Sequence, residues 1–228
     1  MIEYLLLDLD DTIFDFHKAE RIALSKTIRN FGVEPTEAVL ARYHVINKWH
    51  WEQLELGKMT RPQVLEGRFR TLFAELGMTV EAKECTAAYA ENLSVGHYFL
   101  PGAEEALDRL SKKYRLFLVS NGTASVQKGR MASADLYRFF EKVFISQEIG
   151  HNKPAKAYFD ACFAQIPGFD PQKSIIVGDS LTSDIQGGIN AGIRTCWVNP
   201  SHAPGREDIR PDYEIEGIYQ LEALLEKI

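Results

Sequence analysis

The sequence predicts an α/β protein, in which a helical bundle is inserted into a doubly wound parallel sheet. From about residue 100 onward, short apolar runs alternate with helical segments, which is typical of βαβ units and of a sheet covered on both faces. Residues 17–96, in contrast, have helical periodicity almost throughout. We therefore expect a core made of residues 1–15 and 97–228 and a helical unit at 16–96.

The expected strands are short runs rich in β-branched, leucine and aromatic residues. They lie at 4–7, 115–119, 143–146, 174–177, 195–198 and, at an edge, 213–215. Helices of the core are expected at 104–113, 125–136, 156–165, 184–191 and 220–228. Because strands and helices alternate, we expect parallel pairing with helices on both faces of the sheet.

The insert carries the start and stop signals of four helices. These are expected at 20–31, 37–54, 60–77 and 81–93. Gly32 ends the first, Thr36 is a suitable N-cap for the second, and Thr60 with Pro62 begins the third. Four helices with no strand between them predict a small bundle.

The composition is that of an ordinary globular protein. The chain has 228 residues, of which 45% are hydrophobic and 25% charged, and its net charge is −6. This charge argues against binding a nucleic-acid polymer or an anionic membrane. It does not argue against an anionic small molecule, because a metal ion reverses the local sign within one cleft.

The cysteines indicate a reducing compartment. Cys85, Cys162 and Cys196 are odd in number and widely spaced, so they form neither a disulfide framework nor a zinc motif. The amino terminus lacks the basic region of a signal peptide, and no apolar stretch approaches the roughly 20 residues that span a bilayer. We expect a soluble cytoplasmic protein, with monomer and homodimer both open.

Polar residues follow four of the expected strands. They are Asp8 and Asp10; Ser120, Asn121 and Gly122; Lys153 and Pro154; and Gly178, Asp179 and Ser180, with Asp184 shortly after. The carboxyl ends of parallel strands share one edge of the sheet, where ligands bind in open α/β folds. We therefore expect these side chains to meet at one cleft.

Their chemistry is that of phosphoryl transfer. Asp8 is a candidate nucleophile that would form an aspartyl-phosphate, and Asp10 a candidate acid and base. Asp8 and Asp179 offer the hard oxygen ligands that suit Mg²⁺. The Lys153 ammonium and the Ser120 hydroxyl are expected to bind the transferring oxygens.

For two further residues, Asp184 and Thr12, the sequence leaves two alternative tasks each. Asp184 either orients Lys153 or a metal-bound water, or simply caps the helix that follows it. Thr12 either fixes the turn after Asp10 or contacts phosphate.

This set of motifs resembles the haloacid dehalogenase-like hydrolase superfamily. The matching segments are D-L-D-D-T at 8–12, S-N-G at 120–122, K-P at 153–154 and G-D-S-L-T-S-D at 178–184, and the insert occupies the position of that superfamily's α-helical type 1 cap. The resemblance implies a Rossmann-like core and Mg²⁺ held by Asp8, the Asp10 backbone carbonyl and Asp179. It also implies phosphate binding by Ser120, Asn121 and Lys153. The second acid, Asp10, favours a phosphatase over a dehalogenase, which lacks it.

A narrower resemblance is to the pyrimidine 5′-nucleotidase branch. It rests on D-T-I-F-D-F at 11–16, W-E-Q-L-E-L-G-K-M-T at 51–60, the segment 178–188 and T-C-W-V-N-P at 195–200. It implies a small phosphomonoester substrate, a nucleoside monophosphate. Sugar-phosphate or phosphoglycolate hydrolysis by the same mechanism is the alternative.

Five further residues are candidates for substrate specificity. His44, His50 and Trp51 lie in the insert, where polar or aromatic tips suit base recognition. Packing is the alternative, because aromatic residues at helical spacing are usually core. Phe14 and Phe16 either gate the site or pack beside it.

A phospho-accepting signalling module is the alternative from another class. Receiver domains also combine aspartates, a hydroxyl and a lysine around Mg²⁺. Their acidic pair and acceptor lie on different strands, however, and they are shorter and lack a cap. Asp10, two residues from the acceptor, favours rapid hydrolysis over lasting phosphorylation. An inactive relative is disfavoured because every required acid, hydroxyl and lysine is present.

Overall fold

The computed structural model describes residues 1–228, which form two compact units. One comprises Met1–Phe16 and His97–Ile228, and the other comprises His17–Gly96. All the strands belong to the first unit, and the second is wholly helical. None of the helices combines the length and the apolar character that crossing a bilayer requires.

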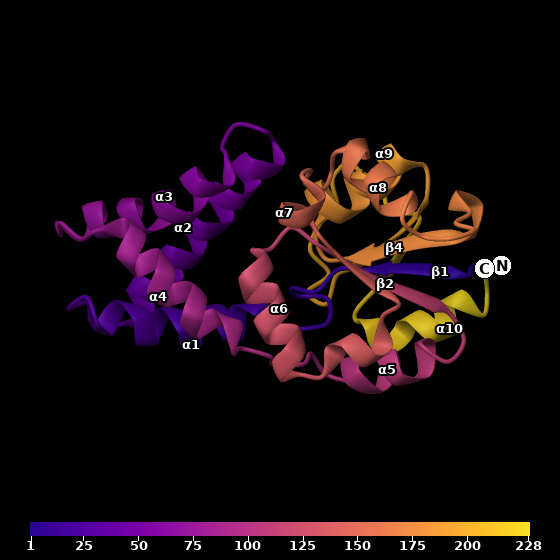
Figure 1. The fold of residues 1–228 in the computed structure, drawn as a ribbon, viewed down its shortest axis with the longest axis horizontal. Helices are drawn as coiled ribbons and strands as arrows, with labels where there is room; N and C mark the ends of the chain where they lie inside the picture. The colour runs from indigo at the N-terminus through magenta and orange to yellow at the C-terminus, as the bar shows by residue number, and fades with distance from the viewer. The chain divides into compact units, whose positions relative to one another are not determined.

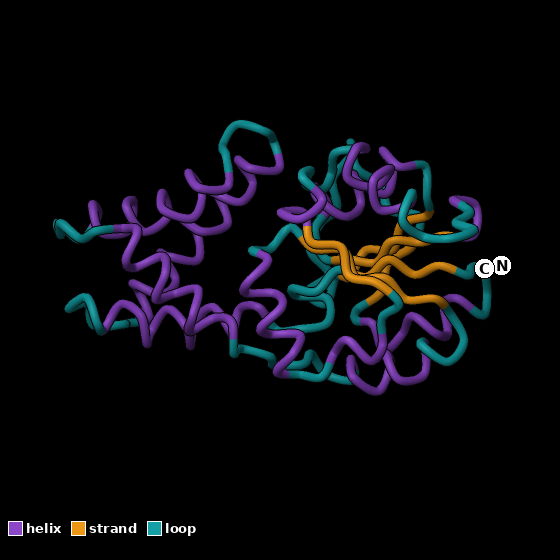
Figure 2. The backbone as a smooth tube through the Cα atoms, in the orientation of Figure 1, coloured by secondary structure: helices purple, strands orange, loops and turns teal.

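The first unit is built on one sheet (Figure 2). It has six strands, and every pairing between them is parallel, as predicted. The strands are β1 (Tyr4–Leu7), β2 (Arg115–Ser120), β3 (Lys142–Ile145), β4 (Ser174–Gly178), β5 (Arg194–Val198) and β6 (Tyr213–Ile215). Their order is β3-β2-β1-β4-β5-β6. The strand order reverses at β1, which pairs with both β2 and β4. Such a reversal opens a ligand crevice at the carboxyl ends of the strands.

Helices cover both faces of this sheet (Figure 1). The first face is covered by α5 (Ala103–Leu110), α6 (Ala124–Ser133) and α10 (Leu221–Leu225), and the second by α8 (Lys156–Phe163) and α9 (Gln186–Ala191). Side chains of β1 alternate between the two: Leu5 and Leu7 point to the first face, and Tyr4 and Leu6 to the second.

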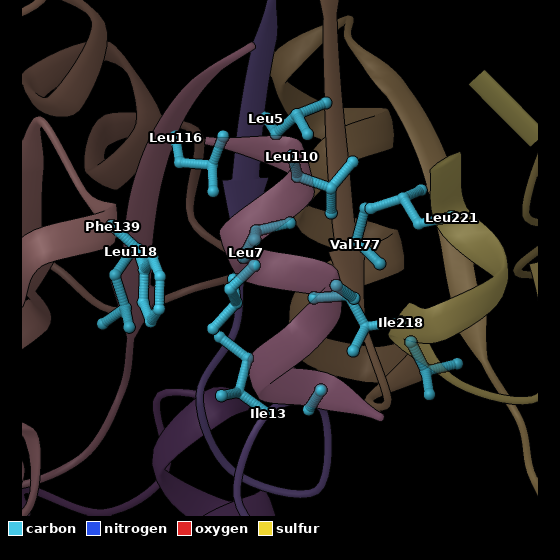
Figure 3. Close-up of a cluster of buried hydrophobic side chains, with 14 of the residues drawn as sticks. Leu5, Leu7, Ile13, Leu110, Leu116, Leu118, Phe139, Val177, Ile218 and Leu221 are labelled. Carbon is cyan, nitrogen blue, oxygen red and sulfur yellow. The ribbon is translucent and has the colours of Figure 1, made fainter. Parts of the chain in front are cut away.

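The core on the first face is almost entirely aliphatic. Leu5 and Leu7 of β1 pack there with Leu110, Ile218 and Leu221 (Figure 3). Fully burying each such side chain contributes about 1.5–3 kcal/mol. This packing holds β1 rigidly, so the residues that follow it have a fixed position.

The second unit contains the four helices predicted for the insert. They are α1 (Phe16–Arg29), α2 (Glu37–Glu55), α3 (Arg61–Glu75) and α4 (Ala82–Ser94). The Thr36 hydroxyl caps α2 by accepting from Val39 N at 3.4 Å. The bundle is held by aromatic contacts: the Tyr43 ring centroid lies 5.2 Å from that of Phe69 and 5.8 Å from that of Tyr89.

Several boundaries differ from the sequence-based expectation. The helix expected at 184–191 begins only at Gln186, because residues 181–185 form a π-helical turn, which the Asp184 side chain holds. The helix expected at 220–228 spans only 221–225. Helix α7 (Ser146–Ile149) and three short 3₁₀ segments, Leu136–Phe139, Pro171–Lys173 and Ile218–Gln220, were not predicted.

Candidate active site

Asp8 and Lys153 form the centre of the site. Asp8 continues β1, since its backbone N–H donates to Val177 O at 2.9 Å. The Lys153 ammonium donates to Asp8 Oδ1 at 2.5 Å, to Asp184 Oδ1 at 2.6 Å and to Val119 O at 3.0 Å. These three bonds use every donor of the ammonium. Lys153 is 1% exposed, so its charge lies inside the protein and is fully directed at these partners.

The charges of this pair depend on each other. Burial lowers the pKa of Lys153, but the adjacent carboxylates of Asp184 and Asp8 outweigh it, so that the pKa lies above its usual value and the ammonium stays charged. Burial raises the pKa of Asp8 well above its usual value, an effect that Lys153 opposes and Asp184 and Asp10 increase. Burial and the charge of Asp8 likewise raise the pKa of Asp179.

The acidic side chains fit a divalent cation. One carboxylate oxygen each from Asp8, Asp179 and Asp184 lies within 4.8 Å of the other two. Lys153 is the cation that pairs with two of them, so the three carboxylates together carry more negative charge than it neutralises. Hard oxygen donors and uncompensated negative charge are the chemistry that Mg²⁺ requires.

The Asp184 carboxylate pairs with Lys153, which is one of the two tasks that the sequence left open, and α9 has no side-chain cap, so Asp184 does not cap the helix that follows it. Its Oδ1 accepts from Lys153, and its Oδ2 accepts from the Ser180 backbone N–H at 3.2 Å, which holds the π-helical turn. Gly178 makes this approach possible, since a Cβ there would lie 2.2 Å from Asp184 Oδ2. The glycine of G-D-S is therefore required by the carboxylate that follows it.

Asn121 positions the lysine. Its Nδ2 donates to Lys153 O at 2.9 Å, and its Oδ1 accepts from Lys153 N at 2.9 Å. Nδ2 also contacts Ser183 Oγ at 3.2 Å. Both ends of the Asn121 amide thus fix the Lys153 backbone, and phosphate binding by Asn121 remains a prediction.

Ser120 and Asp10 are joined by a residue that the sequence did not single out. The Ser120 hydroxyl oxygen accepts from Gly122 N at 3.1 Å and from Gln127 Nε2 at 2.9 Å, which leaves its own proton to donate. Gln127 Nε2 also donates to Asp10 Oδ2 at 2.7 Å, and the Arg130 guanidinium donates to Asp10 Oδ1. The available signal was the pair of polar residues three apart on the helix after S-N-G.

Comparison with known proteins identifies the family. The sequence pattern of the family of haloacid dehalogenase-like hydrolases matches residues 5–198. This range contains all four of the polar segments that follow the strands, at 8–12, 120–122, 153–154 and 178–184. This chain is a haloacid dehalogenase-like hydrolase. The hydrolase is 38% identical to the HAD-hydrolase YfnB of Bacillus subtilis (strain 168), over 97% of this chain and 94% of that protein. A crystal structure of YfnB bound to magnesium superimposes with a TM-score of 0.94, covering 98% of each chain.

Two further relatives match over nearly their whole length. The hydrolase is 36% identical to the pyrimidine 5′-nucleotidase PynA of Streptococcus pneumoniae (strain ATCC BAA-255 / R6), over 99% of this chain and 95% of that protein. It is 31% identical to the pyrimidine 5′-nucleotidase YjjG of Escherichia coli (strain K12), over 98% and 97%.

The loop after β1 in this hydrolase is held mainly by its backbone and by packing. Asp11 N donates to Phe14 O at 2.7 Å, and Phe14 N donates to Leu9 O at 2.9 Å. Thr12 is buried and its hydroxyl makes no hydrogen bond, so this side chain does not fix the turn by hydrogen bonding. Phe14 is fully buried, with its ring centroid 5.0 Å from that of Phe99, which favours packing over gating. The Phe16 ring centroid lies 5.9 Å from the Arg130 guanidinium.

Within the helical unit, the three specificity candidates differ in exposure. His50 is 3% exposed and its Nδ1 lies 2.8 Å from Ile46 O, which favours the packing alternative. His44 is half-buried, and its Nδ1 lies 2.8 Å from Glu20 Oε2. Trp51 is half-buried beneath the guanidinium of Arg61, at 5.5 Å from the ring centroid. Trp51 thus keeps one of its faces against a cation and is the strongest remaining aromatic candidate.

Proposed function

We propose that this hydrolase is a Mg²⁺-dependent phosphomonoesterase that acts on pyrimidine nucleoside monophosphates through an aspartyl-phosphate on Asp8. The observation that carries this proposal is the buried contact of the Asp8 carboxylate with Lys153, next to Asp179 and Asp184. A nucleophile held at the end of a central strand, beside a fixed cation, is suited to attack phosphorus.

In the first step, Asp8 Oδ attacks the phosphorus and the ester P–O bond breaks, while Asp10 donates a proton to the leaving oxygen. In the second, Asp10 removes a proton from water, which attacks the phosphorus and releases inorganic phosphate and free Asp8. The Ser120 hydroxyl, whose proton is left to donate, contacts the transferring oxygens, and Lys153 contacts them once the phosphate replaces one of its present partners. Asp8, Asp179 and the Asp10 carbonyl would hold Mg²⁺, which would supply positive charge that offsets the repulsion between carboxylates and phosphate.

The substrate class rests on the relatives. PynA and YjjG, both named pyrimidine 5′-nucleotidases, match almost end to end. The N-acylneuraminate-9-phosphatase of Mus musculus is 33% identical over only 64% of this chain, and a glyceraldehyde 3-phosphate phosphatase of Methanothermobacter thermautotrophicus is 26% identical. A sugar phosphate is therefore the second candidate substrate.

We assign the choice of leaving group to the helical unit, because the residues that perform the proposed chemistry all lie in the other unit. Trp51 is the residue to test, with Trp49 as a matched control on the same helix, since 49% of its surface is exposed. Trp51→Ala is expected to lower the rate with nucleotides more than with sugar phosphates, whereas Trp49→Ala is expected to leave the ratio unchanged. An equal loss on all substrates would make Trp51 a scaffold residue.

The decisive experiment measures phosphate release with Mg²⁺ from nucleoside monophosphates, sugar phosphates and phosphoglycolate, with Asp8→Asn as the blank. Selective cleavage of pyrimidine monophosphates is the expected result. Cleavage concentrated on sugar phosphates would keep the mechanism and replace the substrate. Absence of any Asp8-dependent release would reject the phosphatase and favour a phospho-accepting role.

A further inference from the structure

We infer that Gln127 and Arg130 are positioning residues, which together hold the Asp10 carboxylate in the direction needed for proton transfer. The inference rests on the proposed function, in which Asp10 is the acid and base. Nothing in the four motifs assigns a task to either residue.

Both oxygens of Asp10 are engaged from a single helix. Gln127 Nε2 donates to Oδ2 at 2.7 Å, and Arg130 Nη1 donates to Oδ1. Since Asp10 follows β1 and the two donors lie on α6, this contact joins segments 117 and 120 residues apart. Two donors on separate oxygens fix the plane of a carboxylate, whereas one would leave it free to rotate.

The donors are themselves fixed. Arg130 Nη1 also donates to Gln127 Oε1 at 3.0 Å, so that the two side chains orient each other. The Arg130 side chain is fully buried, with its guanidinium 5.2 Å from the Phe14 ring centroid and 5.9 Å from that of Phe16. A buried guanidinium is costly unless it is paired, and the acceptor that pairs with this charge is Asp10.

Gln127 also connects Asp10 to the phosphate-binding hydroxyl. Its second Nε2 proton goes to Ser120 Oγ at 2.9 Å. Gly122 leaves room for this amide, because a Cβ at that position would lie 2.3 Å from Gln127 Nε2. The Gln127 amide thereby sets the distance between the Ser120 hydroxyl, which contacts the transferring oxygens, and the Asp10 carboxylate, which moves the proton.

The effect of the two residues is expected on kcat and not on KM. Misplacing a reacting group by about 1 Å can cost about 10²-fold in rate. Arg130→Met and Gln127→Met are each expected to lower kcat for a nucleoside monophosphate by about that factor with KM unchanged. Arg130→Lys, which keeps a donor and the charge, is expected to recover part of the loss. Met131→Ala, buried on the same helix, controls for lost stability, and Lys128→Ala controls for changes at the exposed surface.

The test combines these variants with Asp10→Asn and includes p-nitrophenyl phosphate, whose leaving group departs without a proton. If Gln127 and Arg130 act through Asp10, Arg130→Met has little further effect in the Asp10→Asn background. With p-nitrophenyl phosphate, the single variants are expected to give a burst of one nitrophenol per enzyme followed by slow turnover, because only the second step still needs Asp10. If the losses in kcat multiply in the double variant and no burst is seen with p-nitrophenyl phosphate, the inference is overturned and the proposed function stands. An inactive wild-type enzyme would overturn both.

Discussion

The Lys153 ammonium donates a 2.5 Å hydrogen bond to the Asp8 carboxylate, although the two residues are 145 positions apart in the sequence. Asp8 is held at the end of β1, and Lys153 by the Asn121 amide. Hydrogen bonds to the backbone of each residue therefore fix the position of both members of the pair. A buried pair of this kind contributes little net stability when intact, and is costly to break.

Removing Lys153 should accordingly destabilise the protein. Lys153→Met leaves Asp8 and Asp184 without their shared cation, and we expect a loss of about 3–5 kcal/mol in the free energy of unfolding. Urea unfolding in the absence of divalent cations measures this. Lys156→Met, which breaks the exposed pair with Asp160, is the control and should cost under about 1 kcal/mol. Equal losses in the two variants would contradict this account of the buried pair.

Asp8→Asn should abolish turnover while preserving the fold. The amide retains the shape of the side chain but cannot form an acyl phosphate, so a loss of at least about 10³-fold in kcat is expected. Quenched-flow labelling with radioactive phosphate should show a phosphoenzyme in the wild type and none in the variant. Labelling of Asp8→Asn at the wild-type level would place the nucleophile elsewhere.

Mg²⁺ should stabilise the folded protein against heat. Burial raises the pKa values of Asp8 and Asp179, so the metal-free folded state holds protons more tightly than the unfolded state. The contribution of these two carboxyl groups to stability is therefore fully present below about pH 4 and is lost as the pH rises through their folded pKa values.

At pH 7, saturating Mg²⁺ is expected to raise Tm by about 5–10 °C, the effect of a ligand at about one hundred times its Kd. Asp179→Asn should raise the Tm of the metal-free protein and remove most of the Mg²⁺ response. Asp108→Asn, at an exposed position on α5, should leave the response intact. A full response in Asp179→Asn would show that Asp179 is not a ligand.

Gly178→Ala should separate Asp184 from Lys153. The added Cβ would lie 2.2 Å from Asp184 Oδ2, so the carboxylate must move. We expect a loss of about 1–3 kcal/mol in stability together with a large fall in kcat. Gly205→Ala is the matched control, because a Cβ there meets no atom within 4 Å. Thermal unfolding and phosphate release measure the two effects, and wild-type kcat in Gly178→Ala would reject this role for the glycine.

The cysteines should be unreactive in the native state. Burial raises the pKa values of the Cys85, Cys162 and Cys196 thiols to about 12. At pH 8 only about one molecule in 10⁴ would carry a given thiolate, against roughly a quarter for a free cysteine. Ellman's reagent should therefore react with no thiol in the folded protein and with all three in denaturant. Because the folded state favours the neutral thiol, the raised pKa values contribute to stability. This contribution is fully present below about pH 8.5 and is lost as the pH rises towards 12.

Much of the architecture follows from local patterns in the sequence. All six strands and three helices of the insert lie close to where apolar periodicity and capping residues such as Thr36 place them, whereas α1 begins at Phe16 and ends at Arg29 instead of spanning 20–31. These signals act over a few residues, so they can be recognised from the sequence without knowledge of the fold. The convergence of Asp8 and Lys153 was also predictable, because parallel strands bring their carboxyl ends to one edge of the sheet.

The fold class, the division into core and insert, and the types of residue at each strand end follow from the amino-acid sequence alone. The contacts of the polar side chains are set in the folded protein: Asn121 holds Lys153, Asp184 both pairs with that lysine and closes a turn, and Gln127 links Asp10 to Ser120. The physical reason is that hydrogen bonds form within about 3 Å and depend on direction. Such contacts between distant segments exist only once the packed core has set the positions of their backbones.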